Sequence, residues 1–160
     1  MSDELTHVDA EGRLRMVDVG DKNVSRRLAR VGGEITMRPE TALLIAENKV
    51  AKGNVLEAAR LAAIMAAKRT GDLIPLCHPL NVTAVDVSIE VGRDRVAVEA
   101  EARIEDRTGV EMEAFTAAAV ALLTIYDMCK AVDRGMVISN LRLLEKEGGA
   151  SGRYVRTPER

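Results

Sequence analysis

Aromatic side chains are scarce in this 160-residue chain. It contains one Phe, two Tyr and no Trp. Aromatic rings supply most of the stacking surface that proteins offer to a flat heterocycle. We therefore expect a heterocyclic ligand to be bound without aromatic stacking inside one subunit. We also expect the core to consist of aliphatic residues and Met, with Ala-rich helices lying close to their neighbours.

Cysteine, excess charge and long apolar runs are also lacking. Two cysteines far apart in the sequence, with no secretory leader ahead of them, make no disulfide framework and suit a reducing compartment. The formal net charge is only −2, so the charge balance favours neither a nucleic-acid partner nor an anionic membrane. The longest uncharged apolar run, residues 114–126, is short of the roughly 20 residues that span a bilayer. We expect a soluble, cytoplasmic protein with no membrane partner.

The clearest secondary-structure signal is a β-hairpin. Apolar and polar residues alternate over 85–91 and again over 96–105, on the two sides of Gly92-Arg93-Asp94. Period-two alternation on both sides of a short turn is typical of two antiparallel strands with one buried face and one wet face.

The other elements are predicted from glycine, proline and helix-capping residues. A short strand is predicted at 34–38, after Gly32-Gly33, and a helix at 39–47 with Pro39 in its first position. Asn54 and Glu57 form a capping-box pattern for a helix that runs to Gly71. The further predicted elements are a helix over 110–132, opened by a second capping box of Thr108 and Glu111, and a last strand over 136–146.

The order β, α, α, β, β, α, β predicts the fold class. It is typical of an α+β, ferredoxin-like two-layer sandwich, with a four-stranded antiparallel sheet and helices on one face. We divide the chain into a mobile N-terminal arm (1–31), one ferredoxin-like domain (32–152) and a C-terminal tail (153–160).

A stiff connector, Leu73-Ile-Pro-Leu-Cys-His-Pro79, holds one of the two histidines and one of the two cysteines. Residues before proline are held in extended conformations, where neighbouring side chains point opposite ways. Cys77 and His78 should therefore not face one pocket, and no zinc-ligand spacing is present. We expect His78 in a site, with Cys77 contributing backbone or bulk; the alternative is a proline-flanked turn whose His is satisfied by a local hydrogen bond.

The long helix carries a second group of candidates. Asp127 and Lys130 are three residues apart and can pair, as many surface residues on helices do. Glu113 lies 14 residues before Asp127, on nearly the same face but about 21 Å away along the axis. If one site uses both carboxylates, a second subunit must supply one of them. An antiparallel pairing of two such helices through their Ala-rich surface at 117–121 would allow it.

Several basic residues could bind phosphate, although neither a P-loop nor a Rossmann fingerprint is present. They are Lys22, Lys52, Lys68, Arg69 and Lys146.

Five segments together resemble one known family. They are MVDVGDK (16–22), KGNV (52–55), AAKRTGDLIPLCHPL (66–80), DRTGVEMEA (106–114) and LTIYDMCKAVDRGMVI (123–138). The chain resembles the cyclic pyranopterin monophosphate synthase family, protein C of molybdenum cofactor biosynthesis, over most of its length. The resemblance implies an enzyme that converts 3′,8-cyclo-7,8-dihydro-GTP into cyclic pyranopterin monophosphate and pyrophosphate. It also implies a homohexamer built as a trimer of dimers, with the active site at a dimer interface.

The resemblance also implies roles for individual residues. The catalytic pair falls on Asp127 and Lys130, and the substrate-binding segments fall on Leu76, Cys77, His78, Met112 and Glu113. Lys52 matches a charged position of the same site, and Lys22, Lys146, Asp18 and Glu111 do so less closely. The family often has a lysine where this chain has Ala150, and an arginine at 26, 27 or 30 could replace it. No cofactor is required, although Mg²⁺ can accompany the triphosphate.

The implied chemistry suits these residue types. A lysine in a cationic neighbourhood can act as acid and then as base, so Lys130 is the candidate for proton transfer and Asp127 for orienting it. Cations must stabilise the departing pyrophosphate, a role for Lys52, Lys22 and Lys146. Glu113 and the backbone near Cys77 can bind the guanine-derived edge. The alternatives are a non-catalytic nucleotide-binding regulator of the same fold and an inert assembly subunit.

Overall fold

One antiparallel sheet organises the chain, whose computed structural model describes residues 8–157. Within these residues the strands are β1 (Ser25–Thr36), β2 (Ala84–Val91), β3 (Arg95–Asp106), β4 (Val137–Glu147) and β5 (Tyr154–Val155). They lie in the order β2-β3-β1-β4-β5. The first strand, β1, is thus central, paired with β3 on one side and β4 on the other.

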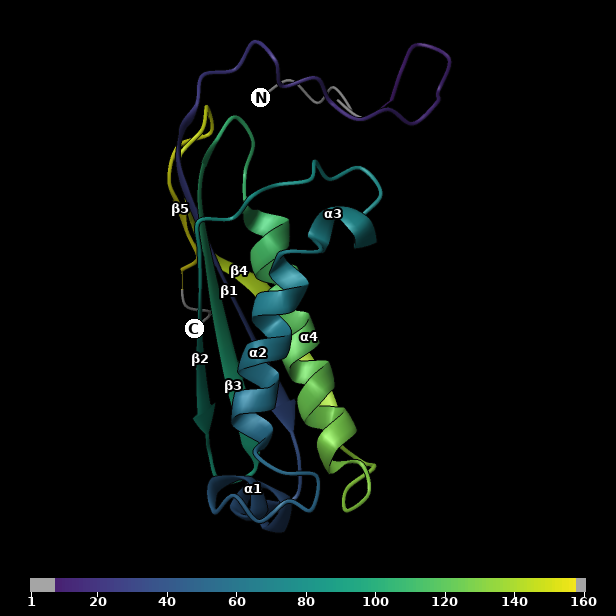
Figure 1. Cartoon of the computed structure of the whole chain (residues 1–160), viewed down its shortest axis with the longest axis vertical. Coiled ribbons are helices and arrows are strands. Elements are labelled where there is room, and N and C mark those ends of the chain that lie inside the picture. The colour runs from purple at the N-terminus through teal and green to yellow at the C-terminus, as the bar shows by residue number, and fades with distance from the viewer. Residues whose placement is uncertain (1–7, 158–160) are drawn as a thin grey trace.

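The helices form a second layer. They are α1 (Pro39–Ala46), α2 (Val55–Ala67), α3 (Thr70–Leu73) and α4 (Glu111–Cys129). Figure 1 shows α2 and α4 packed side by side against one face of the sheet, with α1 at the end where α4 finishes and α3 at the end where α4 begins. The structure is therefore an α+β sandwich whose helices lie on one face, as predicted.

The hairpin forms where the alternating pattern predicts it. β2 and β3 pair with Val91 opposite Val96, on either side of the turn at 92–94. In β3 the predicted inward set is fully or almost fully buried, from Val96 to Ile104. Only Val87 of the corresponding set in β2 is buried, because β2 lies at the edge of the sheet.

Strand β1 is longer than predicted. It begins at Ser25, so residues 25–31, which we assigned to the arm, belong to the centre of the sheet, and Ala29 and Val31 are fully buried. The glycines at 32 and 33 do not precede the strand but lie inside it. A Cβ on Gly33 would stand 2.8 Å from Leu122 Cδ1, so glycine allows α4 to lie close to the sheet at this point.

The C-terminal part also differs from the prediction. The sheet has five strands in the described residues instead of four, because Tyr154 and Val155, predicted to be tail, pair with Lys146 and Glu145. Residues 1–7 of the predicted arm and 158–160 of the predicted tail lie outside the described residues.

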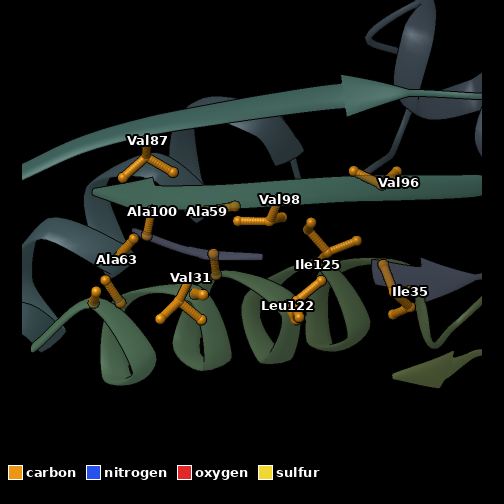
Figure 2. Packing of buried hydrophobic residues seen from close by; sticks show 14 of the residues in the cluster. Val31, Ile35, Ala59, Ala63, Val87, Val96, Val98, Ala100, Leu122 and Ile125 are labelled. Atoms are coloured by element: carbon orange, nitrogen blue, oxygen red, sulfur yellow. The ribbon is translucent and has the colours of Figure 1, made fainter. Parts of the chain in front are cut away.

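The core fills the space between the sheet and helices α2 and α4 (Figure 2). Ile35, Leu122 and Ile125 are its largest fully buried side chains, and alanines such as Ala63 and Ala118 let the two helices approach each other. By length and composition α4 is apolar enough to cross a membrane. In this structure the apolar face of α4, which bears Leu122 and Ile125, packs on the sheet and forms part of the core.

Only one of the two predicted capping boxes forms its cap. The Asn54 side chain accepts a hydrogen bond from the Glu57 amide at 3.1 Å, and Pro39 opens α1 as expected. The prediction for Thr108 and Glu111 was wrong. Helix α4 starts at Glu111 after Val110, with no side-chain cap, and the Glu111 carboxylate lies against Gly109 instead of reaching back to the Thr108 amide.

Candidate active site

A cavity of about 490 Å³ lies at the end of the molecule where α4 begins. Its size is within the range of small-molecule sites. Five parts of the chain surround it: the segment 17–22, Arg27 of β1, the connector 76–80, residues 108–113 at the start of α4 and the segment 146–151. Seven of the predicted site residues line it, namely Lys22, Leu76, Cys77, His78, Met112, Glu113 and Lys146.

The connector contributes both Cys77 and His78 to this cavity, although we expected only His78 to face it. Burial, together with the negative charge of Glu113, raises the pKa of the Cys77 thiol. A thiol that resists ionisation is a poor nucleophile, so Cys77 contributes bulk and backbone here. Helix α3 lies close against the connector, since a Cβ on Gly71 of α3 would stand 3.1 Å from Pro79 Cα.

The first turn of α4 contributes two carboxylates to the cavity, those of Glu111 and Glu113. Glu113 is only 3% exposed, and burial, followed by the charge of Glu111, raises its pKa. Glu111, which we had explained as a capping residue, lines the cavity as well. Glu113 therefore offers the cavity a carboxyl group that holds its proton more tightly than an exposed one.

Three cations line the same cavity. Lys22, Arg27 and Lys146 reach the cavity from the segment before β1, from β1 itself and from the end of β4. The Arg27 guanidinium donates to the carbonyls of Asp106 at 3.2 Å and Arg107 at 2.9 Å, which fixes its position.

Arg27 is a charged cavity residue outside our list of site residues, although the sequence offered it, with Arg26 and Arg30, as a replacement for the lysine that the resemblance implies at position 150. Gly149 allows its approach, since a Cβ on Gly149 would overlap the guanidinium. Ala150 lines the same cavity, so this arginine stands close to the position where the family often has a lysine. The alternation of buried Ala29 and Val31 with Arg30 was the sequence signal that places Arg27 on a strand.

The remaining predicted residues form a second cluster at the other end of α4. The Asp127 carboxylate receives hydrogen bonds from Lys130 Nζ at 2.6 Å and from Lys52 Nζ at 3.0 Å, and Lys52 also donates to the Asp127 carbonyl at 2.9 Å. Lys130, and then Lys52, hold the pKa of Asp127 below its usual value. The carboxylate is thus ionised between two ammonium groups. Asp18 lies in neither cluster, and its carboxylate accepts from the Gly20 amide in a turn.

The two clusters lie far apart within one chain. Glu113 and Asp127 sit near the opposite ends of α4, about 21 Å apart at about 1.5 Å per residue. Figure 1 shows the connector beside α3 at one end and the loop before α2, which carries Lys52, at the other. The Lys52, Asp127 and Lys130 side chains are 46%, 56% and 51% exposed, so one subunit leaves this cluster open to solvent. In residues 8–157, no group of three or more His, Cys, Asp or Glu side chains is arranged to hold a metal ion.

Comparison with known proteins identifies the family. The MoaC family model matches residues 16–149, which include both clusters. This chain belongs to the MoaC family. The MoaC-family chain is 56% identical over 154 residues to the cyclic pyranopterin monophosphate synthase of Desulforapulum autotrophicum, covering 95% of this chain and 94% of the relative. It is 57% identical over 156 residues to the protein of the same name from Methylobacterium sp., covering 96% and 98%. Cyclic pyranopterin monophosphate synthase 3 of Mycobacterium tuberculosis is 56% identical over 153 residues, covering 95% and 86%.

Proposed function

We propose that this chain is a lyase of molybdenum cofactor biosynthesis that converts 3′,8-cyclo-7,8-dihydro-GTP into cyclic pyranopterin monophosphate and pyrophosphate. The observation that carries the proposal is the 56% identity, over 95% of the chain, to a relative named for this synthase activity. The residues that we assign to the reaction lie in the two clusters. A non-catalytic regulator is not favoured, because the relatives are named as synthases.

The 490 Å³ cavity is the proposed substrate site. Lys22, Arg27 and Lys146 supply three cations from different segments, enough to hold a triphosphate without a P-loop. Glu113 and the backbone near Cys77 bind the guanine-derived edge, because a buried carboxyl group can accept or donate a hydrogen bond according to its protonation. No metal ion is required in this scheme, and Mg²⁺ can arrive bound to the triphosphate.

Closing the cyclic phosphate is a displacement at phosphorus. A hydroxyl of the sugar-derived part attacks the innermost phosphorus, the new P–O bond forms, and the bond to pyrophosphate breaks. The hydroxyl proton passes to a base, and the cations stabilise the negative charge on pyrophosphate as it leaves.

The Lys52–Asp127–Lys130 cluster is the proposed acid and base machinery for the ring rearrangement. Asp127 holds the Lys130 ammonium at 2.6 Å, and Lys52 adds a second positive charge beside the same carboxylate. Lys130 can give a proton to a ring nitrogen and recover one from carbon.

We infer that two copies of the chain assemble each complete site. The distance of about 21 Å between Glu113 and Asp127 is too long for one small molecule, whereas an antiparallel neighbour brings the Asp127 end of one α4 to the Glu113 end of another. The Ala-rich surface at 117–121 is not available to such a neighbour, because Ala117, Ala118 and Ala121 are fully buried within one chain. The exposed apolar side chains that a neighbour can cover on the helical layer are Leu61, Met65 and Leu123. The proposed assembly is a homohexamer, a trimer of dimers.

We further infer that the fold is ferredoxin-like at its centre. Strands β2-β3-β1-β4 follow the order and antiparallel pairing that a split βαβ arrangement produces, and β5 is a two-residue addition beside β4. The proposed compartment is the cytoplasm, where the free thiols of Cys77 and Cys129 remain reduced.

The decisive experiment supplies 3′,8-cyclo-7,8-dihydro-GTP to the purified protein and measures pyrophosphate and the fluorescent pterin product together. Both should appear in equal amounts. Lys130→Ala is the matched control, because this exposed side chain can be shortened without disturbing the core. Binding of the substrate with no release of pyrophosphate would indicate a regulator and would refute the proposed activity.

A further inference from the structure

Asp133 is a buried carboxylate that belongs to neither cluster. It lies in the loop that follows Lys130, and it is 6% exposed. One oxygen accepts hydrogen bonds from the Arg38 amide at 2.9 Å and from the Thr41 hydroxyl at 3.1 Å. The other oxygen accepts from the Gly135 amide at 3.1 Å.

These contacts join the loop after α4 to the start of α1. The Arg38 guanidinium lies 3.6 Å from the Asp133 carboxylate and also donates to the Val132 carbonyl. Thr41 is in the first turn of α1 and is 1% exposed, so its hydroxyl has been removed from water and is satisfied by Asp133. The Arg38 amide has the strongest effect in lowering the pKa of Asp133, which keeps the carboxylate ionised at this junction.

The same two segments meet again at the second cluster. Helix α1 is followed by the loop that carries Lys52, and Lys52 Nζ returns to the carboxylate and carbonyl of Asp127. The chain therefore makes a closed ring. One half runs from Asp127 through Lys130 to Asp133, the other runs from Arg38 through α1 to Lys52, and noncovalent contacts close both ends.

The two closures differ in strength. The Lys52–Asp127 contact is about half exposed to solvent, and ion pairs of that kind contribute little on their own. The Asp133 carboxylate and the Thr41 hydroxyl that donates to it are buried, the contacts from the Arg38 and Gly135 amides are partly buried, and all three hydrogen bonds have a charged acceptor. The Asp133 contacts thus determine where the exposed Lys52–Asp127 contact can form.

We propose that Asp133 is a positioning residue, which sets the geometry of the Lys52–Asp127–Lys130 cluster by anchoring the loop after α4 to the first turn of α1. The inference rests on the proposed function for its kinetic effect, but its structural effect can be measured without turnover. Asp133 itself does not touch the substrate.

Two substitutions of Thr41 test the proposal with little change in volume. Thr41→Val removes the hydroxyl that donates to Asp133, whereas Thr41→Ser keeps it. Because a small displacement of catalytic groups costs on the order of tenfold to a hundredfold in rate, kcat of Thr41→Val should fall by about that factor, with KM changed less than about twofold. Thr41→Ser should retain kcat close to that of the unaltered protein. Asp133→Asn should show the loss of Thr41→Val in stronger form.

A second measurement separates this inference from the proposed activity. The Asp127 carboxyl can be titrated by ¹³C NMR in each full-length variant. Its pKa is held low by Lys130 and Lys52, so a displaced Lys52 should raise it in Thr41→Val but not in Thr41→Ser. Folded Thr41→Val protein with unchanged kcat and unchanged Asp127 titration would overturn the proposal. If the unaltered protein shows no turnover, the proposed function fails, and the titration alone decides the role of Asp133.

Discussion

Mixing two inactive variants tests whether two subunits share each site. Glu113→Gln alters the cavity and Lys130→Ala removes the proposed acid-base lysine. These residues lie near opposite ends of α4, about 21 Å apart along the helix. Each variant alone should lose turnover. When the two are unfolded together in equal amounts and refolded, some sites receive the cavity from a Lys130→Ala chain and the cluster from a Glu113→Gln chain, and both halves of such a site are unaltered.

The expected recovery follows from the geometry. Half of the cavities come from Lys130→Ala chains, and half of these meet a cluster from a Glu113→Gln chain, so about one quarter of the sites are intact under random assembly. Pyrophosphate release per chain should therefore reach about one quarter of that of the unaltered protein. The control is the same pair mixed without unfolding. Recovery no greater than the sum of the two variants after refolding would show that each site lies within one chain.

Three further predictions concern single residues. Because the pKa of Glu113 is raised in the folded protein, ionisation of this carboxyl destabilises the fold as pH rises through that pKa. In urea unfolding, Glu113→Gln should therefore be more stable than the unaltered protein at pH 8 but not below about pH 4. An equal difference in stability at both pH values would contradict this. Gly71→Ala should lower kcat several-fold with a small change in Tm, because the new Cβ pushes on the Pro79 backbone; an unchanged kcat would show that the connector tolerates the shift. Leu122→Ala should lower the free energy of unfolding by about 2–5 kcal/mol in urea titration, since this side chain is fully buried, and a loss below about 1 kcal/mol would show that the core refills the space.

The sequence predicted best those elements whose signal is local. The β2–β3 hairpin was found because its alternation extends over both strands and is broken only by the turn. The Asn54 cap was found because the side chain and the amide it accepts from are three residues apart. In both cases the residues that cause the structure are neighbours in the chain.

The sequence was least informative where distant segments decide the structure. Gly32 and Gly33 looked like a strand boundary, yet they allow close contact with Leu144 and Leu122, far along the chain. The capping box at Thr108 failed because the Glu111 carboxylate faces a cavity formed by other segments. No local pattern distinguishes a carboxylate that caps a helix from one that faces a ligand site.

The candidate site shows the same division. The ten residues assigned to it fall into two groups, with seven around the cavity and with Lys52 and Lys130 both bound to Asp127. The sequence did not distinguish Arg27 from Arg26 and Arg30, because the contacts that hold Arg27 are with Asp106 and Arg107, about 80 residues later in the chain. The arrangement of the two groups across a pair of subunits stays a prediction.

Helix α4 also restricts how the length of this protein can vary. One residue inserted between Glu113 and Asp127 would turn one end against the other by about 100° and move it by about 1.5 Å. Seven inserted residues would nearly restore the facing but lengthen the helix by about 10 Å, beyond the reach of any side-chain adjustment. Insertions and deletions should therefore be tolerated in the turn at 92–94 but not within these 19 residues.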